Sequence, residues 1–317
     1  MHTIAFLFPG QGSQSVGMGR ELAAMYPVAE QTFEEADSAL GYTISKLCFE
    51  GPEQKLKLTE ITQPAILTVS VAVFRVLREK GIAPAYVAGH SVGEYAAHVA
   101  AGTLEFSDAV RVARNRGRYM QEAVPLGQGA MAAILGMAPG DVRSVCLDAA
   151  QEEIVEPANN NSPEQVVISG HAAAVQRAAE LAKERGAKKA VMLQVSAPFH
   201  CSLLKPAQDR LEQDLNAIEF YDPEVPVIAN IDGEPRTNAA EARDALIRQA
   251  TGAVQWERSM ARLISLGIDV FVEAGPGKVL CGLMRQIDRS KLCLSVQDEA
   301  SLQKTMNELE PRHTEPG

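Results

Sequence analysis

The segment from Tyr86 to Glu94, Tyr-Val-Ala-Gly-His-Ser-Val-Gly-Glu, decides the predicted fold of this chain. An apolar, strand-like run precedes its G-x-S-x-G pattern, and a helical pattern follows it. A serine on such a tight strand-to-helix turn has strained backbone angles, and the flanking glycines let strand and helix approach closely. The helix then offers N–H groups and a positive dipole end to an oxyanion. The segment predicts a nucleophile at Ser91, and an ordinary glycine-rich turn is the alternative.

Strands and helices alternate along the flanking sequence, as in the βα units that build a parallel sheet. Strands are predicted over residues 4–8, 86–89, 225–230 and 270–273. Helices are predicted over residues 19–26, 63–80, 92–101 and 108–123, with Ser107 as the N-cap of the last. Together with the serine turn, this alternation predicts an α/β-hydrolase-like domain with a parallel sheet and a nucleophile elbow.

The middle of the chain has a different order of elements. Its pattern is strand, helix, strand, strand, helix, strand over residues 130–135, 140–152, 154–159, 165–169, 172–185 and 189–195. A compact βαββαβ order predicts a small ferredoxin-like domain inserted into the larger one. The large domain is therefore predicted to be discontinuous, over 1–128 and 196–302, with the small domain over 129–195. The polar, proline-containing end, 303–317, is expected to be a loosely ordered tail.

The bulk composition excludes several classes of protein. Of the 317 residues, 46% are apolar and 22% are charged, as in soluble globular proteins, and the net charge of −10 argues against a nucleic-acid partner. No apolar run approaches the length of a membrane span, and the N-terminus lacks a basic signal-like region, so we expect a cytoplasmic protein without membrane contact. Five scattered cysteines form no C-x-x-C pair or Cys/His cluster. We therefore expect no disulfide framework and no metal.

A serine nucleophile needs a base, and the chain contains six histidines. His200 lies in a loop just after the last strand of the insertion, where the chain re-enters the large domain, and this position favours it. His90 adjoins Ser91 but points away from it if the strand alternation persists, and His98 falls on the following helix. No acidic residue stands out as the third member of a triad, because most carboxylates between Ser91 and His200 fall in the insertion.

Several motifs in a fixed order resemble the malonyl-CoA:acyl carrier protein transacylase family of bacterial fatty acid synthesis, which is related to polyketide synthase acyltransferases. The resemblance extends over residues 4–296. A group of such motifs is far more specific than G-x-S-x-G alone. They are FPGQGSQ (8–14), ITQPA (61–65), GHSVGEY (89–95), RGRYMQEAVP (116–125), RQATGAVQW (248–256) and EAGPGKVL (273–280).

The resemblance implies a role for each matching residue of the catalytic machinery. Ser91 would attack the malonyl thioester, and His200 would accept its proton and return it to the departing thiol. The backbone carbonyl of Gln249 would orient His200 in place of an aspartate. The backbone N–H groups of Gln11 and Val92 would form the oxyanion hole.

The resemblance also implies which residues bind the acyl group. Arg116 would hold the free malonyl carboxylate, for which a planar guanidinium is suited, although the residues alone do not distinguish it from three neighbouring arginines. Gln63 and Asn161 match pocket positions, but a glutamine at a helix start and an asparagine in a turn also have structural explanations. In related polyketide acyltransferases, a bulky aromatic at the position of Phe199 accompanies malonyl over branched acyl groups.

By this resemblance, malonyl-CoA is the substrate, coenzyme A is released, acyl carrier protein is the partner, and no cofactor takes part. We expect a monomer that works by a ping-pong mechanism. A discrete acyltransferase of a polyketide synthase is an alternative within the same class. A serine thioesterase or other hydrolase is a second alternative, since G-x-S-x-G is common there. A non-catalytic scaffold is a third, and it would form no acyl-enzyme.

Overall fold

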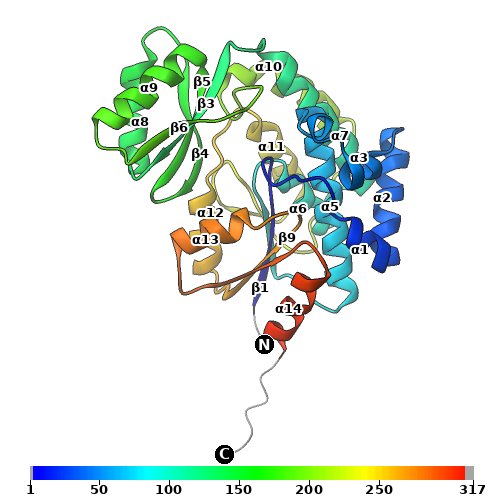
Figure 1. Cartoon of the computed structure of the whole chain (residues 1–317). Coiled ribbons are helices and arrows are strands. Elements are labelled where there is room, and N and C mark those ends of the chain that lie inside the picture. The colour runs from blue at the N-terminus through cyan, green and yellow to red at the C-terminus, as the bar shows by residue number, and fades with distance from the viewer. Residues whose placement is uncertain (1–2, 311–317) are drawn as a thin grey trace, which may run out of the picture.

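The computed structural model describes residues 3–310 and contains two separate sheets (Figure 1). The larger sheet has six strands in the order β10-β9-β1-β2-β7-β8, and all neighbours are parallel except β7 and β8. The predicted α/β class with a parallel sheet is therefore confirmed. The strands are β1 (Ile4–Phe8), β2 (Tyr86–Gly89), β7 (Val227–Ile228), β8 (Pro235–Arg236), β9 (Val270–Ala274) and β10 (Leu292–Val296).

Helices cover both faces of the larger sheet (Figure 1). Alternate residues of β1 explain this arrangement: Phe6 and Phe8 pack in the cluster that contains α5, whereas Leu7 packs in the cluster of α12 and α13. The helices before the small sheet are α1 (Arg20–Met25), α2 (Pro27–Leu40), α3 (Ile44–Glu50), α4 (Glu53–Leu56), α5 (Thr59–Glu79), α6 (Gly93–Ala100) and α7 (Phe106–Ala123). Those after it are α10 (Lys205–Asn216), α11 (Ala239–Gln249), α12 (Trp256–Ser265), α13 (Val279–Ile287) and α14 (Glu299–Leu309).

The smaller sheet has the order β4-β5-β3-β6, and every pairing in it is antiparallel. It is built, in chain order, from β3 (Gly129–Leu135), α8 (Pro139–Ala150), β4 (Val155–Ser162), β5 (Gln165–His171), α9 (Ala172–Glu184) and β6 (Lys189–Met192). This is the predicted βαββαβ order, and all six elements lie within residues 129–195. Its two helices pack on the sheet around a hydrophobic cluster of its own.

Helix α5 is the long central helix of the larger part. By length and composition it could cross a membrane, so the expectation that no apolar run has this property is wrong. However, 83% of its most apolar window is buried inside the protein. It packs between α7 and α2 and contributes many of the core residues, which is the burial of a core helix rather than that of a membrane span.

Three expectations from the sequence are wrong: Ser107 as an N-cap, a loosely ordered tail from residue 303, and the absence of disulfides. Helix α7 begins at Phe106, which is buried in the core, so Ser107 lies inside the helix and does not cap it. The tail from residue 303 is helical to Leu309, since a capping box at Asp298 starts α14 and Leu302 is buried; residues 311–317 lie outside the described residues. A disulfide joins Cys281 of α13 to Cys293 of β10, whose Cα atoms lie 5.3 Å apart.

Candidate active site

Ser91 lies on the turn between β2 and α6, with a positive φ of 54° that L-residues rarely adopt. The two glycines of the motif are required by packing. A Cβ at Gly89 would overlap the backbone of Gly93, and a Cβ at Gly93 would overlap the carbonyl oxygen of Phe8 in β1. The predicted strained turn with close strand–helix contact is therefore confirmed.

Asn230, just after β7, fixes the backbone of this turn from the neighbouring strand. Its Oδ1 accepts a hydrogen bond from the Ser91 N–H at 2.7 Å, and its Nδ2 donates to the Gly89 carbonyl at 2.6 Å. This role of Asn230 is not predicted from the sequence, although the residue ends a predicted strand. Carboxyl ends of adjacent parallel strands meet at one edge of the sheet, and this was the available signal.

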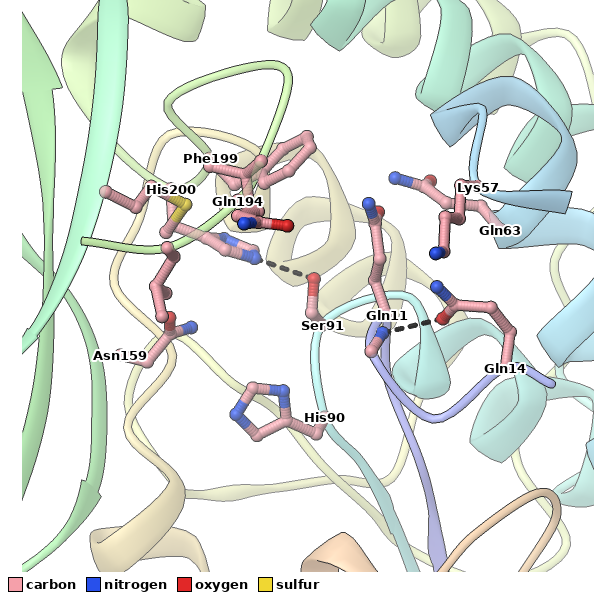
Figure 2. A pocket seen from close by; sticks show the side chains of 14 residues that line it. Gln11, Gln14, Lys57, Gln63, His90, Ser91, Asn159, Gln194, Phe199 and His200 are labelled. Atoms are coloured by element: carbon pink, nitrogen blue, oxygen red, sulfur yellow. Dashed lines mark hydrogen bonds between the residues drawn. The ribbon is translucent and has the colours of Figure 1, made fainter. Parts of the chain in front are cut away.

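His200 faces the nucleophile from the loop that follows the small sheet (Figure 2). Its Nε2 lies 2.7 Å from Ser91 Oγ, and its Nδ1 lies 3.0 Å from the Gln249 carbonyl and 3.2 Å from that of Gly252. Because both carbonyls accept only, they assign the proton to Nδ1 and leave Nε2 free to accept from the serine. The structure thus places Ser91, His200 and the Gln249 carbonyl as the predicted catalytic roles require, with Gly252 as an additional acceptor.

Burial and the nearby positive charge of Arg116 lower the pKa of His200 from 6.5 to about 3, and the backbone carbonyls oppose this only in part. The imidazole is therefore neutral at any ordinary pH. A neutral imidazole is the form that can accept the serine proton, so the base is always in its competent state.

Arg116 is 1% exposed and reaches the nucleophile from α7. Its Nη2 lies 3.2 Å from Ser91 Oγ and 3.0 Å from Gln249 Oε1, and its Nη1 donates to Gln63 Oε1 at 2.8 Å. Among residues 3–310, no carboxylate lies within ion-pair distance of it. The site therefore contains a buried cation whose hydrogen-bond acceptors are all neutral oxygens, and its Cζ lies 5.7 Å from the centre of the Tyr95 ring.

The two residues predicted to form an oxyanion hole flank the nucleophile. Gln11 lies in the loop after β1, and Val92 is the N-cap of α6. Gly10 packs against the carbonyl of His90, too closely for a Cβ, and this contact holds the β1 loop beside the elbow. Within the described chain, neither the Gln11 nor the Val92 N–H donates a hydrogen bond, so both are available to an incoming oxyanion.

A cavity of about 410 Å³ opens over Ser91 and His200, between the two sheets (Figure 2). Both Gln63 and Phe199 line it, as predicted. Asn161 does not line it; its Oδ1 lies 2.9 Å from the Nε2 of His90, which turns toward it rather than toward Ser91. The cavity has further polar lining residues that are not predicted from the sequence, namely Gln14, Lys57, Asn159 and Gln194.

The elbow serine, the carbonyl-oriented histidine and the free N–H donors have the geometry that serine-dependent acyl transfer requires. A family model described as acyl transferase domain matches residues 5–313, and the chain belongs to this family.

Similar proteins are named malonyl CoA-acyl carrier protein transacylase. The one from Escherichia coli (strain K12) is 51% identical over 288 residues, covering 90% of this chain and 93% of the relative. The one from Bacillus subtilis is 47% identical and covers 98% of both chains. Among solved structures, the transacylase from Coxiella burnetii superposes with a TM-score of 0.96 at 45% identity, covering 98% of both chains. A malonyl-transacylase in complex with a type II polyketide synthase acyl carrier protein superposes with a TM-score of 0.94 at 46% identity. The match covers 96% of this chain and 99% of that chain.

The elbow geometry predicts that an alanine is not tolerated at residue 93. Gly93→Ala should lower the free energy of unfolding by about 1–3 kcal/mol and displace the nucleophile, because β1 or α6 must move. Gly282→Ala is the matched control: it also lies in a helix, its Cβ would contact nothing, and we expect a gain of about 0.5–1 kcal/mol. Denaturant titration measures both, and equal effects would contradict the packing argument.

The lowered pKa of His200 predicts how serine reactivity depends on pH. A base works only when neutral, and this one is protonated only near pH 3, so labelling of Ser91 by a fluorophosphonate should show no histidine titration from about pH 8 to about pH 5. Arg116→Ala removes a cation that lowers the pKa of His200. The pH at which the labelling rate declines in acid should therefore move toward neutral pH. Arg111→Ala, on the exposed face of the same helix, should change nothing. A wild-type labelling rate that halves near pH 6.5 would refute the assignment.

Proposed function

We propose that the chain transfers a malonyl group from malonyl-CoA to the phosphopantetheine thiol of an acyl carrier protein, through malonyl-Ser91, in fatty acid synthesis. The observation that carries this proposal is Arg116. A buried guanidinium without a carboxylate partner is costly, and a substrate with a free carboxylate supplies the missing charge next to the reacting serine. The names of the relatives point to the same acyl group.

In the first half-reaction, His200 Nε2 accepts the proton as Ser91 Oγ attacks the thioester carbonyl. The oxyanion then lies against the N–H groups of Gln11 and Val92, and each such donor contributes about 3–4 kcal/mol to lowering the barrier. The intermediate collapses as the carbon–sulfur bond breaks. The proton on His200 goes to the sulfur, and coenzyme A leaves as the thiol.

In the second half-reaction, the thiol of the carrier protein takes the place of coenzyme A. His200 accepts its proton as the sulfur attacks the malonyl ester. The carbon–oxygen bond to Ser91 then breaks, the proton on His200 returns to Ser91 Oγ, and the malonyl thioester of the carrier protein leaves. The Gln249 and Gly252 carbonyls keep the imidazole in one tautomer but stabilise an imidazolium less than a carboxylate does. A thiol, with a pKa of about 8.5, is easy to deprotonate and suits this weak base.

We also propose that the reaction uses no metal or other cofactor, since the serine, the histidine and backbone donors account for every proton and bond. Acyl carrier protein is the protein partner, and malonyl-CoA is the small-molecule substrate. We propose a monomer that acts in the cytoplasm, where malonyl-CoA is consumed.

A second candidate is the same transfer to a carrier protein of a polyketide synthase. It is favoured by one observation: a solved structure with a TM-score of 0.94 to this chain is a malonyl-transacylase bound to a type II polyketide synthase carrier. Transfer rates to purified carriers of both pathways distinguish the two.

Covalent labelling tests the nucleophile and the reaction class together. Incubation with malonyl-CoA should add one malonyl group at Ser91, detectable by mass spectrometry, and Ser91→Ala should carry none. A transferase holds this adduct until a carrier thiol is added, whereas a hydrolase releases malonate at the rate of thioester loss. An adduct on Ser91→Ala, or rapid malonate release without a carrier, would overturn the proposal.

Replacing the arginine tests the choice of acyl group. Arg116→Ala should lower kcat/KM for malonyl-CoA by about a hundredfold, because a charge-assisted, bidentate contact is lost, and should affect acetyl-CoA far less. Arg111→Ala is again the control from the exposed face of α7. Equal losses for the two acyl groups would show that Arg116 supports the fold of the site rather than the carboxylate.

A further inference from the structure

Glu94 is a fully buried carboxylate in the first turn of α6, three residues after the nucleophile. It does not line the cavity. Its Oε2 accepts a hydrogen bond from Gln249 Nε2 at 2.6 Å and another from the Asn230 N–H at 3.1 Å. Glu94 therefore contacts two residues that themselves hold the site together, and the reaction described above gives it no role.

The side chain of Gln249 links Glu94 to the arginine. Its Nε2 donates to Glu94 Oε2 and, at 2.9 Å, to the Ser91 carbonyl, while its Oε1 accepts from Arg116 Nη2. A flipped amide would place an oxygen against two acceptors and an NH₂ against a donor, so its orientation is determined. The backbone carbonyl of Gln249 holds His200 separately, which lets side-chain substitutions be interpreted on their own.

We propose that Glu94 is a positioning residue for acyl-group selection: it anchors the Gln249 amide, which in turn holds Arg116 beside Ser91 Oγ. The inference rests on the proposed function, since Arg116 is taken to bind the malonyl carboxylate. The neutral amide between the Glu94 carboxyl group and the Arg116 guanidinium explains the arrangement. A carboxylate in direct contact with Arg116 would neutralise the guanidinium and compete with the substrate, whereas the amide transmits position and leaves the charge free.

The surroundings of Glu94 agree with an anchor that is held from one side. Within residues 3–310 its Oε1 has no hydrogen-bond partner, and the Nε2 of His98, on the same helix, lies 3.9 Å from it. Burial raises the pKa of Glu94 to about 7, and the bonds from Gln249 and Asn230 together with the charges of Arg236 and Arg116 oppose the rise. The two bonds to Oε2 thus fix the carboxylate against a large desolvation cost.

Two conservative variants separate position from charge. Glu94→Asp keeps an ionisable carboxyl group but withdraws it by one methylene from Gln249. Glu94→Gln keeps an acceptor oxygen at the same reach without an ionisable group. Single-turnover acylation of Ser91 by malonyl-CoA and acetyl-CoA gives the ratio of the two kcat/KM values. We expect Glu94→Asp to lower the malonyl-to-acetyl ratio about tenfold and Glu94→Gln to retain most of it. The reverse pattern, or an equal loss for both acyl groups, would overturn the proposal.

A double-mutant cycle tests whether Glu94 acts through Gln249. Gln249→Met removes the three side-chain bonds but keeps the backbone carbonyl, so it should lower the same ratio. Adding Glu94→Asp to it should lower the ratio no further, since the link is already broken; additive effects would contradict the proposal. If Glu94→Asp does not fold, the malonyl-to-acetyl ratio of Gln249→Met alone decides the test. An amide that holds Arg116 in place requires this ratio to decrease when the amide is removed.

Glu273→Asp is the matched control. Glu273 is also fully buried, and it accepts from the backbone N–H groups of Leu280 and Cys281, away from the cavity. Its variant should lose stability without changing the ratio, and a changed ratio would show that any buried glutamate has this effect. Wild-type protein that forms no malonyl-Ser91 would overturn the proposed function itself, whereas a normal wild-type preference that survives both Glu94→Asp and Gln249→Met overturns only the positioning role.

Discussion

At the nucleophile turn, the backbones of β2, α6 and β1 approach so closely that neither Gly89 nor Gly93 has room for a Cβ atom. This contact fixes where α6 begins relative to the sheet, and Ser91 adopts its strained φ as a result. The same contact places the Val92 N–H beside the serine and sets the Gln11 loop against the elbow through Gly10. One packing constraint therefore positions the nucleophile and both expected oxyanion donors.

A second constraint comes from polar groups that the chain must bury. Asn230 accepts from the Ser91 N–H and donates to the Gly89 carbonyl, and its own N–H donates to Glu94. Gln249 then connects Glu94 to Arg116 and, through its backbone, to His200. Each donor in this network has an acceptor from a different element. The elements that carry these residues therefore cannot shift independently.

The sequence predicts the parts of this structure that depend on local pattern. The bounds of β1 and β2 and the order of elements in the small sheet follow from apolar runs and turn residues. The elbow at Ser91 follows from two glycines and the strand before them. These features are short-range, so one sequence is enough to find them.

The remaining features depend on contacts between distant segments. Resemblance to a family selected Arg116 among four arginines, and the physical difference is that only Arg116 is buried against the nucleophile. Nothing local marks the Gln249 side chain as a partner of the Ser91 carbonyl, 158 positions away. The prediction of a loosely ordered segment from residue 303 is wrong as far as Leu309 for the same reason, since the burial of Leu302 stabilises α14.

The charges of the site explain why a backbone carbonyl, and not a carboxylate, orients His200. Every described oxygen that contacts Arg116 or the imidazole belongs to an amide, a carbonyl or a hydroxyl. An aspartate behind His200 would raise its basicity, but it would add a negative charge close to the guanidinium and to the carboxylate of the substrate. Keeping the acceptors neutral preserves the attraction of Arg116 for an anionic acyl group. The cost is a weaker base for the Ser91 hydroxyl in the first half-reaction. In the second half-reaction the proton comes from a thiol, which ionises more readily than an alcohol and needs less from the base.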